Sequence, residues 1–375
     1  MRYHELSPRQ GERDPRPGWR WRLVCLLIVA LAGRTAAAAE DIATRYFGMA
    51  VQGDLAGAEA MLQSGARSSR AAADLAKRFR DRFVGVSEVR PPVSDRAVVN
   101  EIVEAYRRYW RVALMGQAGL GDAEKQLQAE LRLAMERHGA AAALMTDVET
   151  QAAVGRLLTA AGFGVQQGRT PPLMDLLLWR TEQRRDYAVD LTDGVQPVSV
   201  RFLSDFVVKG WLDYATFGHA SAGGWATDDA LYCLADRYDT ASETFLVSYL
   251  KHEARHFADY QLFPGLPSTD MEYRAKLTEL IYAESTLQDL LAQFEATAAD
   301  DPSASHAFAA HQVIEGLKVS ALPPGSMPGD PLAIRRESRR QLDWHTSALV
   351  EGGEALVSRG VFASGVPGLV EDSPR

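Results

Sequence analysis

The sequence predicts an α+β protein that is predominantly helical and contains a small antiparallel sheet. Two patterns and the composition lead to this fold class. Long stretches rich in Ala, Arg, Leu and Glu, mainly within residues 41–150, repeat their apolar positions at intervals of three and four. The segment 187–202 instead alternates apolar and polar residues around a turn, which is typical of a β-hairpin. The hydrophobic fraction of 46% is that of a chain that buries a globular core.

The amino-terminal segment has the pattern of a signal peptide. Several arginines precede about ten apolar residues at 23–32, and Ala37-Ala-Ala39 fits an A-x-A cleavage site. This apolar run is too short for a hydrocarbon core of ~30 Å, which takes about 20 residues. We therefore expect residues 1–39 to be a signal peptide and the protein to be exported, either periplasmic or secreted. Cys25 begins the apolar run, where a lipoprotein cysteine would end it, so we expect no lipid anchor.

Changes in composition divide the rest of the chain into three regions. We expect a helical amino-terminal region at 40–150, a region at 151–320 that carries the chemistry, and a carboxy-terminal loop, helix and loose tail at 321–375. The net charge of −8 does not favour a nucleic-acid partner. Peripheral membrane association stays open, with no feature that supports it. After removal of the leader only Cys233 remains, which excludes an internal disulfide and predicts a buried thiol.

The clearest strands flank a two-residue turn. Tyr187-Ala-Val-Asp-Leu-Thr192 alternates, Asp193-Gly194 is a hairpin turn, and Val198-Ser-Val-Arg-Phe202 alternates again. Further along, the segment 223–235 combines a glycine turn with β-favouring residues. Its alternatives are a buried turn or a short helix over 228–234.

The segment His252-Glu253-Ala254-Arg255-His256 has the form HExxH. On a helix, two imidazoles four residues apart project from one face and can bind one zinc ion. In this arrangement Glu253 is not a ligand: it takes a proton from the zinc-bound water. A T-x-x-E capping box at 240–243 and apolar residues at intervals of three and four predict the helix, and Pro264-Gly265 ends it. The alternative is a pair of histidines satisfied within a packing face.

A catalytic zinc also needs a third protein ligand and an open position for water. The next helical segment, 271–284, offers Glu272 and Glu279. They are seven residues apart and so lie on the same face. Either carboxylate can reach the metal.

The stretch from Tyr249 to Glu284 resembles the gluzincin metallopeptidases. Glu272-Tyr-Arg-Ala-Lys276 is similar to the E-x-x-A-D signature of one gluzincin branch. The resemblance implies a zincin-like core within 151–320 and assigns the third ligand to Glu272. Lys276 stands where that branch has an aspartate behind a zinc-bound histidine, so Glu279 or Asp259 would have to substitute. There is no H-x-x-G-x-x-H extension of the metzincin kind.

The resemblance also implies features around the metal. In such peptidases an edge strand before the metal-binding helix binds extended substrate, which would place residues 225–227 in the cleft. Gluzincins commonly steady the oxyanion with a His or Tyr, and His306 or Tyr282 is the candidate here. His311 is five residues from His306, so the two cannot both face the metal from one regular helix. Both histidines can also be purely structural.

These patterns together predict an exported zinc-dependent metallopeptidase. His252, His256 and Glu272 would hold Zn²⁺, and Glu253 would be the general base for hydrolysis of a peptide or protein substrate. The alternative is a non-catalytic periplasmic binding or scaffold protein with a structural or remnant zinc site. A water in the fourth coordination position would support the enzyme, and a fourth protein ligand would support the structural site.

Overall fold

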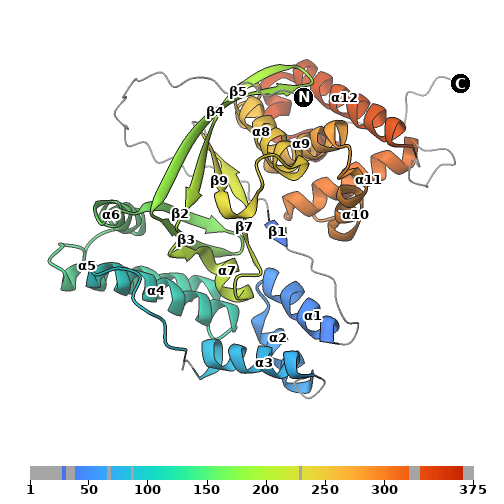
Figure 1. The fold of residues 1–375 in the computed structure, drawn as a ribbon. Helices are drawn as coiled ribbons and strands as arrows, with labels where there is room; N and C mark the ends of the chain where they lie inside the picture. Colours follow the sequence, from blue (N-terminus) through green and yellow to red (C-terminus); the bar gives the residue numbers. More distant parts are fainter. Residues whose placement is uncertain are drawn as a thin grey trace, which may run out of the picture. The chain divides into compact units, whose positions relative to one another are not determined.

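The computed structural model describes residues 28–30, 39–65, 69–85, 88–227, 230–320 and 330–365. The chain divides into two compact units. Unit 1 contains 184–202 and the chain from Gly224 onward, and unit 2 contains 26–183 and 203–223. Helices predominate over strands in the described residues and the sheets are antiparallel where their pairing is resolved, so the fold is α+β and mostly helical (Figure 1).

Unit 1 is built around the helix α9 (Ser268–Tyr282). This helix contacts α8 (His252–Leu262), α11 (Ser305–Ser320) and α12 (Pro331–Arg359), and α10 (Leu287–Thr297) packs on α11 (Figure 1). The segment before α8 is the π-helical η3 (Thr244–Lys251), and short 3₁₀ turns lie at Ala235–Arg237 and Phe362–Ser364. Every residue from Asp270 to Leu280 is buried, because α9 has neighbours on several sides.

The sheet of unit 1 contains the predicted hairpin. Strands β4 (Thr181–Leu191) and β5 (Gly194–Ser204) are neighbours, and β9 (Leu231–Leu234) and then β8 (Gly224–Ala226) follow in the sheet order. Tyr187, Val189 and Leu191 are buried together with Val198, Val200 and Phe202 in the cluster that also contains the apolar side chains of η3 and α8. The hairpin prediction is therefore confirmed, and one face of the ribbon packs against the helix that carries both histidines. The predicted position of the turn is off by one residue: the turn is Thr192-Asp193, and Gly194 already begins β5.

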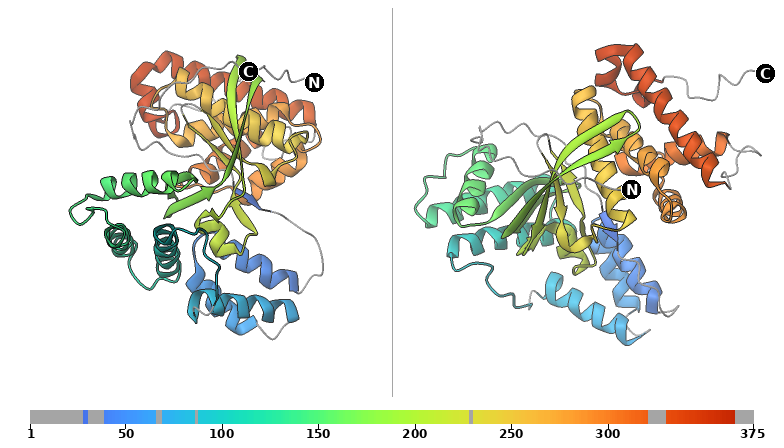
Figure 2. Two further views of the ribbon diagram at one scale, coloured as in Figure 1. Left: turned by 60° about the vertical axis from the view of Figure 1, so that its left-hand side comes forward. Right: turned by 45° about the horizontal axis from the view of Figure 1, so that its top comes forward.

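Unit 2 contains the remaining helices and two small sheets. The helices are listed in chain order: α1 (Ala39–Val51), α2 (Leu55–Gly65), α3 (Arg70–Phe79), η1 (Arg80–Val84), α4 (Ala97–Leu114), α5 (Leu120–Arg137), α6 (Asp147–Ala160) and α7 (Gly210–Thr216). One sheet has the order β2 (Gly164–Thr170), β3 (Leu173–Trp179), β6 (Val208–Lys209), and β1 (Ile28–Ala30) pairs with β7 (Ala220–Ala222). Figure 2 shows α1, α2 and α3 gathered in one group.

The predicted signal peptide, residues 1–39, lies outside the described residues except for Ile28–Ala30 and Ala39, and Cys25 lies outside them too. Among the helices that the structure describes, none combines the length and the apolar character needed to cross a bilayer. Cys233 is a buried free thiol, as expected.

Asp175 of β3 connects this strand to α7. Its Oδ1 accepts hydrogen bonds from the backbone N–H of Leu176 (2.9 Å) and of Trp211 (2.8 Å). Burial raises the pKa of this carboxyl to about 6, although hydrogen bonds from Thr170, Trp211 and Leu176 oppose the shift. The folded state therefore holds the proton more tightly than the unfolded state. This contribution to stability is complete below about pH 4 and is lost as the pH rises through about 6.

We expect Asp175→Asn to remove that pH dependence. An asparagine keeps an oxygen for both N–H groups but cannot ionise, so its unfolding free energy should exceed that of the wild type by about 2 to 3 kcal/mol at pH 7.5. The difference should shrink toward pH 4.5. Urea unfolding at both pH values measures it, and an equal pH dependence in the two proteins would contradict the assignment.

Candidate metal centre

The helix that carries the HExxH segment begins in η3 and continues into α8. Phe245 and Tyr249 stack with ring centroids 5.5 Å apart, and both side chains are buried against the sheet. His252 and His256 continue this buried stripe, as the spacing predicts, with exposures of 1% and 0%. π-helical turns like η3 are rare and often lie at functional sites.

The predicted capping box at the start of this helix is wrong. Ser242 Oγ accepts the hydrogen bond from the Phe245 N–H at 3.2 Å. Glu243 instead accepts from the backbone N–H groups of Glu284, Ser285 and Thr286, which precede α10. Three such donors outcompete the single N–H group that a capping box offers. Burial opposes ionisation of Glu243, but these donors and the Ser285 and Thr286 hydroxyls lower its pKa to about 2.

Three side chains converge between α8 and α9. His252 Nε2 lies 3.1 Å from His256 Nε2, His256 Nε2 lies 3.2 Å from Glu272 Oε1, and His252 Nε2 lies 3.5 Å from Glu272 Oε2. Ligands at 2.0–2.2 Å from a tetrahedral ion are separated from each other by about 3.3 to 3.6 Å. The observed separations are close to this range, so the buried group of His252, His256 and Glu272 can hold a metal ion.

Glu279 occupies a different position from Glu272. Its Oε1 lies 2.7 Å from His252 Nδ1, the ring nitrogen that faces away from His256. Burial disfavours a charge on His252, but Glu279 and Glu272 outweigh it and raise the pKa of this imidazole. A carboxylate behind a ligating histidine fixes the ring and raises its basicity. Glu279 thus stands where the resemblance expects a supporting aspartate.

The other two residues considered for that support lie elsewhere. Asp259 pairs with Arg274 at 2.9 Å and with Arg255 at 3.5 Å. Lys276, which replaces the aspartate of the family signature, has its ammonium 4.4 Å above the ring of Phe294.

Glu253 differs from Glu272 in having no ion pair in the described residues: both oxygens of Glu272 also lack hydrogen bonds there, but imidazole nitrogens lie 2.9 to 3.5 Å from them. Glu253 is 0% exposed, and neither carboxylate oxygen has a hydrogen-bond partner in the described part of the chain. Burial raises its pKa to about 7, a shift that His252 and His256 oppose. A buried carboxylate without partners costs several kcal/mol of desolvation, roughly. Such groups are frequent at functional sites, where a reactant supplies the missing partner.

The two residues predicted to steady an oxyanion differ in position. His306 lies in the first turn of α11, with Nδ1 2.9 Å from Glu272 Oε2. Tyr282 has other neighbours. The ammonium of Lys251 lies 3.7 Å from its ring centroid. Besides burial, which raises the pKa of its hydroxyl, the charged groups that shift this pKa are Asp190, Arg339, Arg255 and Asp193. The structure therefore brings His306, but not Tyr282, into contact with the candidate ligands.

The pattern of the sequence did not reveal the ion pairs that hold α8 in place. Arg255, which lies between the two histidines in the chain, is 0% exposed and makes two hydrogen bonds of 2.8 and 2.6 Å to Asp193 in the hairpin turn. Arg274 of α9 joins Asp259 of α8 to Thr346 of α12. The signal available in the sequence was an arginine between two histidines on a helix predicted to pack against the core, because a buried arginine needs an acidic partner.

The described residues of this segment form the strands β8 (Gly224–Ala226) and β9 (Leu231–Leu234), so residues 231–234 are not part of the alternative short helix. β8 is the last strand of the sheet order and packs against α8. Gly224 makes a close approach to η3 and β9 possible: a Cβ there would lie 2.4 Å from Tyr249 Cε2 and 2.3 Å from the carbonyl oxygen of Tyr232. Binding of an extended substrate along residues 225–227 stays a prediction.

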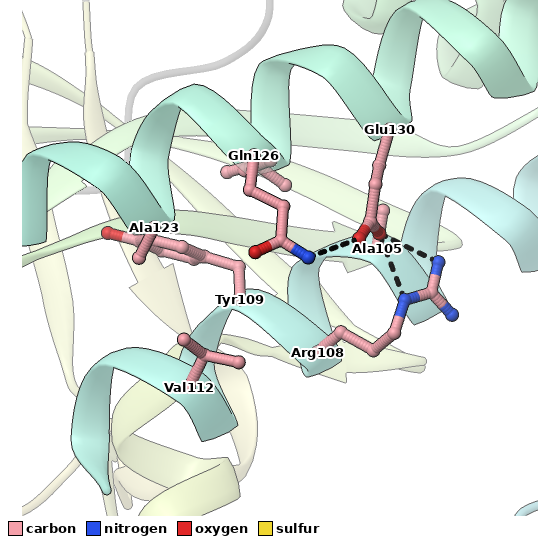
Figure 3. A pocket seen from close by; sticks show the side chains of 8 residues that line it. Ala105, Arg108, Tyr109, Val112, Ala123, Gln126 and Glu130 are labelled. Atoms are coloured by element: carbon pink, nitrogen blue, oxygen red, sulfur yellow. Dashed lines mark hydrogen bonds and ion pairs between the residues drawn. The ribbon is translucent and has the colours of Figure 1, made fainter. Parts of the chain in front are cut away.

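A small hollow lies between α4 and α5 in unit 2 (Figure 3). Its volume is about 10 Å³, which is room for about one water molecule. Three of its polar side chains pair with one another: Glu130 accepts from Arg108 at 2.9 Å and from Gln126 at 3.1 Å. The hydroxyl of Tyr109 accepts instead from the Met174 N–H at 3.0 Å. This hollow has no polar group directed at a ligand and is not a candidate site.

Comparisons of this chain with protein-family models, curated proteins and solved structures found no match.

Single substitutions should separate the ligands from the supporting residue. We expect His256→Ala and Glu272→Ala to abolish high-affinity binding of Zn²⁺, because each removes a donor atom. Glu279→Gln should retain the ion with an affinity about 10- to 100-fold lower, because it removes only the support of His252. Competition with a chromophoric chelator measures all three. Glu295→Gln, an exposed substitution on α10, is the control. Retention by Glu272→Ala together with loss by Glu279→Gln would reverse the two roles.

We expect Gly224→Ala to lower the unfolding free energy by about 1 to 3 kcal/mol, because the added methyl group collides with a backbone oxygen and the Tyr249 ring. Gly121→Ala is the matched control, since a Cβ on this helical glycine meets no atom within 4 Å. That variant should be unchanged or more stable by about 0.5 to 1 kcal/mol. Denaturant unfolding compares the two, and equal stabilities would show that β8 does not approach Tyr249 as described.

Proposed function

We propose that this chain is a zinc-dependent hydrolase that cleaves peptide bonds in a peptide or protein substrate. The donor set consists of two imidazole nitrogens and one carboxylate, which is a common set for catalytic zinc. The same set suits other divalent transition metals, and zinc is favoured by the near-tetrahedral separations of the donor atoms. A zincin-like core, formed by α8, α9 and the sheet that ends in β8, is part of this proposal.

The observation that carries the proposal is the state of Glu253. A structural metal site has no use for a buried carboxylate without partners, and its desolvation destabilises the fold. A general base needs such a group, with a pKa near the working pH. The pKa of about 7 for Glu253, raised by burial, meets this requirement.

The number of ligands also supports an enzyme over a structural site. Structural zinc sites almost always have four protein ligands, and catalytic sites have three. The described residues contribute three to the group whose donor atoms lie within 4.8 Å of one another. The structural zinc site of the non-catalytic alternative requires a fourth, whereas a remnant site would share the three ligands and lack activity.

In the proposed reaction each residue has a separate task. Bound zinc would polarise the scissile carbonyl and lower the pKa of a coordinated water from 15.7 to about 7. Glu253 takes the proton from the attacking water and transfers it to the leaving amine. Glu279 keeps His252 in the orientation in which Nε2 faces His256 and Glu272, the residues that would hold the ion with it. His306, which contacts Glu272, is the candidate to steady the oxyanion.

We expect Glu253→Gln to retain zinc and to lose hydrolysis by 10²-fold or more, on the order of general-base contributions. Glutamine keeps the size of the side chain and removes its basicity, so the fold should survive. Cleavage of casein or a peptide library, together with metal content, measures the effect, and Glu295→Gln is again the control. A Glu253→Gln protein as active as the wild type would overturn the role. Zinc binding without peptide cleavage in either protein would favour the non-catalytic alternative.

A further inference from the structure

Glu272 has a contact that a ligand role alone does not explain. Its Oε1 lies 3.2 Å from His256 Nε2, whereas its Oε2 lies 3.5 Å from His252 Nε2 and 2.9 Å from His306 Nδ1. His306 belongs to α11, which packs along α9. The carboxylate therefore lies at ion-pair distance from the two histidines of α8 and from a third imidazole on another helix, and neither of its oxygens has a hydrogen bond in the described residues.

The geometry separates His306 from the ligands. A fourth ligand of a tetrahedral ion would lie about 3.3 to 3.6 Å from each of the other three donor atoms. The donor atoms of His252, His256 and Glu272 all lie within 4.8 Å of one another, and His306 does not belong to that group. His306 therefore contacts the candidate ligand Glu272, but it lies outside the set of donor atoms that could surround one ion.

Exposure separates it further. Glu272 and both ligand histidines are at most 1% exposed, whereas the side chain of His306 is 41% exposed. Its partner relation to Glu272 resembles that of Glu279 to His252. Glu279 Oε1 lies 2.7 Å from Nδ1 of His252, and His306 Nδ1 lies 2.9 Å from Oε2 of Glu272. In each pair, a residue outside the three-residue group contacts one of its members.

We propose that His306 is a positioning residue for the metal centre: its Nδ1 holds Oε2 of Glu272, so that Oε1 is directed to the ion. This inference rests on the proposed metal site. It gives the carboxylate ligand a supporting partner, which ligating carboxylates generally have. It also assigns Nδ1 of His306 to the protein and leaves Nε2 for substrate.

The test compares substitutions that retain one or the other ring nitrogen. Asparagine places its amide nitrogen near the position of Nδ1, and glutamine places it near Nε2. We expect His306→Asn to bind Zn²⁺ with nearly wild-type affinity. His306→Gln and His306→Ala should bind it about 10- to 100-fold more weakly. His311→Ala, a partly exposed histidine on the same helix, is the matched control and should be unchanged.

Two readouts make the test decisive. Competition with a chromophoric chelator gives the affinity, and the visible spectrum of the Co²⁺ form reports the coordination geometry. Equal affinities and equal spectra for the Asn and Gln variants would overturn the inference, even if His306→Ala did not fold. A loss in His306→Asn as complete as in His256→Ala would make His306 a ligand and overturn it as well. A wild-type protein that binds neither ion would instead overturn the proposed metal site itself.

Discussion

The candidate site depends on the contact between two helices that a short turn folds against each other. The chain from Phe263 to Pro267 separates α8 from α9, so the start of α8 lies beside the end of α9. His252 therefore meets Glu279, and His256 one turn later meets Glu272. Glu272 and Glu279 are about 10 Å apart along the helix axis. Because of this offset, Glu272 reaches the Nε2 atoms of both histidines, whereas Glu279 reaches Nδ1 of His252.

Such a contact is costly to form. Burial of a carboxylate disfavours its charge by several kcal/mol, roughly, and three of them lie here with exposures of 0 to 3%. Burial opposes the ionised form of Glu272, but His306, His256 and His252 lower its pKa well below the ordinary value. Glu253 gains no comparable partner, and burial raises its pKa. The same surroundings therefore lower the pKa of one glutamate and raise the pKa of the other.

Ion pairs around the site hold α8 and α9 in register. Arg255 ties α8 to Asp193 in the hairpin turn, and Arg274 ties α9 to Asp259 of α8. The chain of contacts continues into α12, where His345 lies 3.1 Å from Asp270. Buried pairs of this kind add little net stability, because desolvation offsets most of the attraction. They are directional, however, and a shift of α9 by one turn would break them. These ion pairs therefore fix the positions of the donor atoms of His252, His256 and Glu272.

The sequence by itself determined the features that depend on local spacing. HExxH on a helix puts His252 and His256 on one face, a spacing of seven puts Glu272 and Glu279 on another, and strict alternation marks the hairpin. Only the tertiary structure decided which glutamate joins the histidines, because that depends on how far α9 slides along α8. It also placed His306 beside Glu272 and Tyr282 beside Lys251. Glu243 binds the backbone N–H groups that precede α10 and not the start of its own helix. These outcomes depend on contacts between distant segments, and a one-dimensional pattern carries no information about their offset.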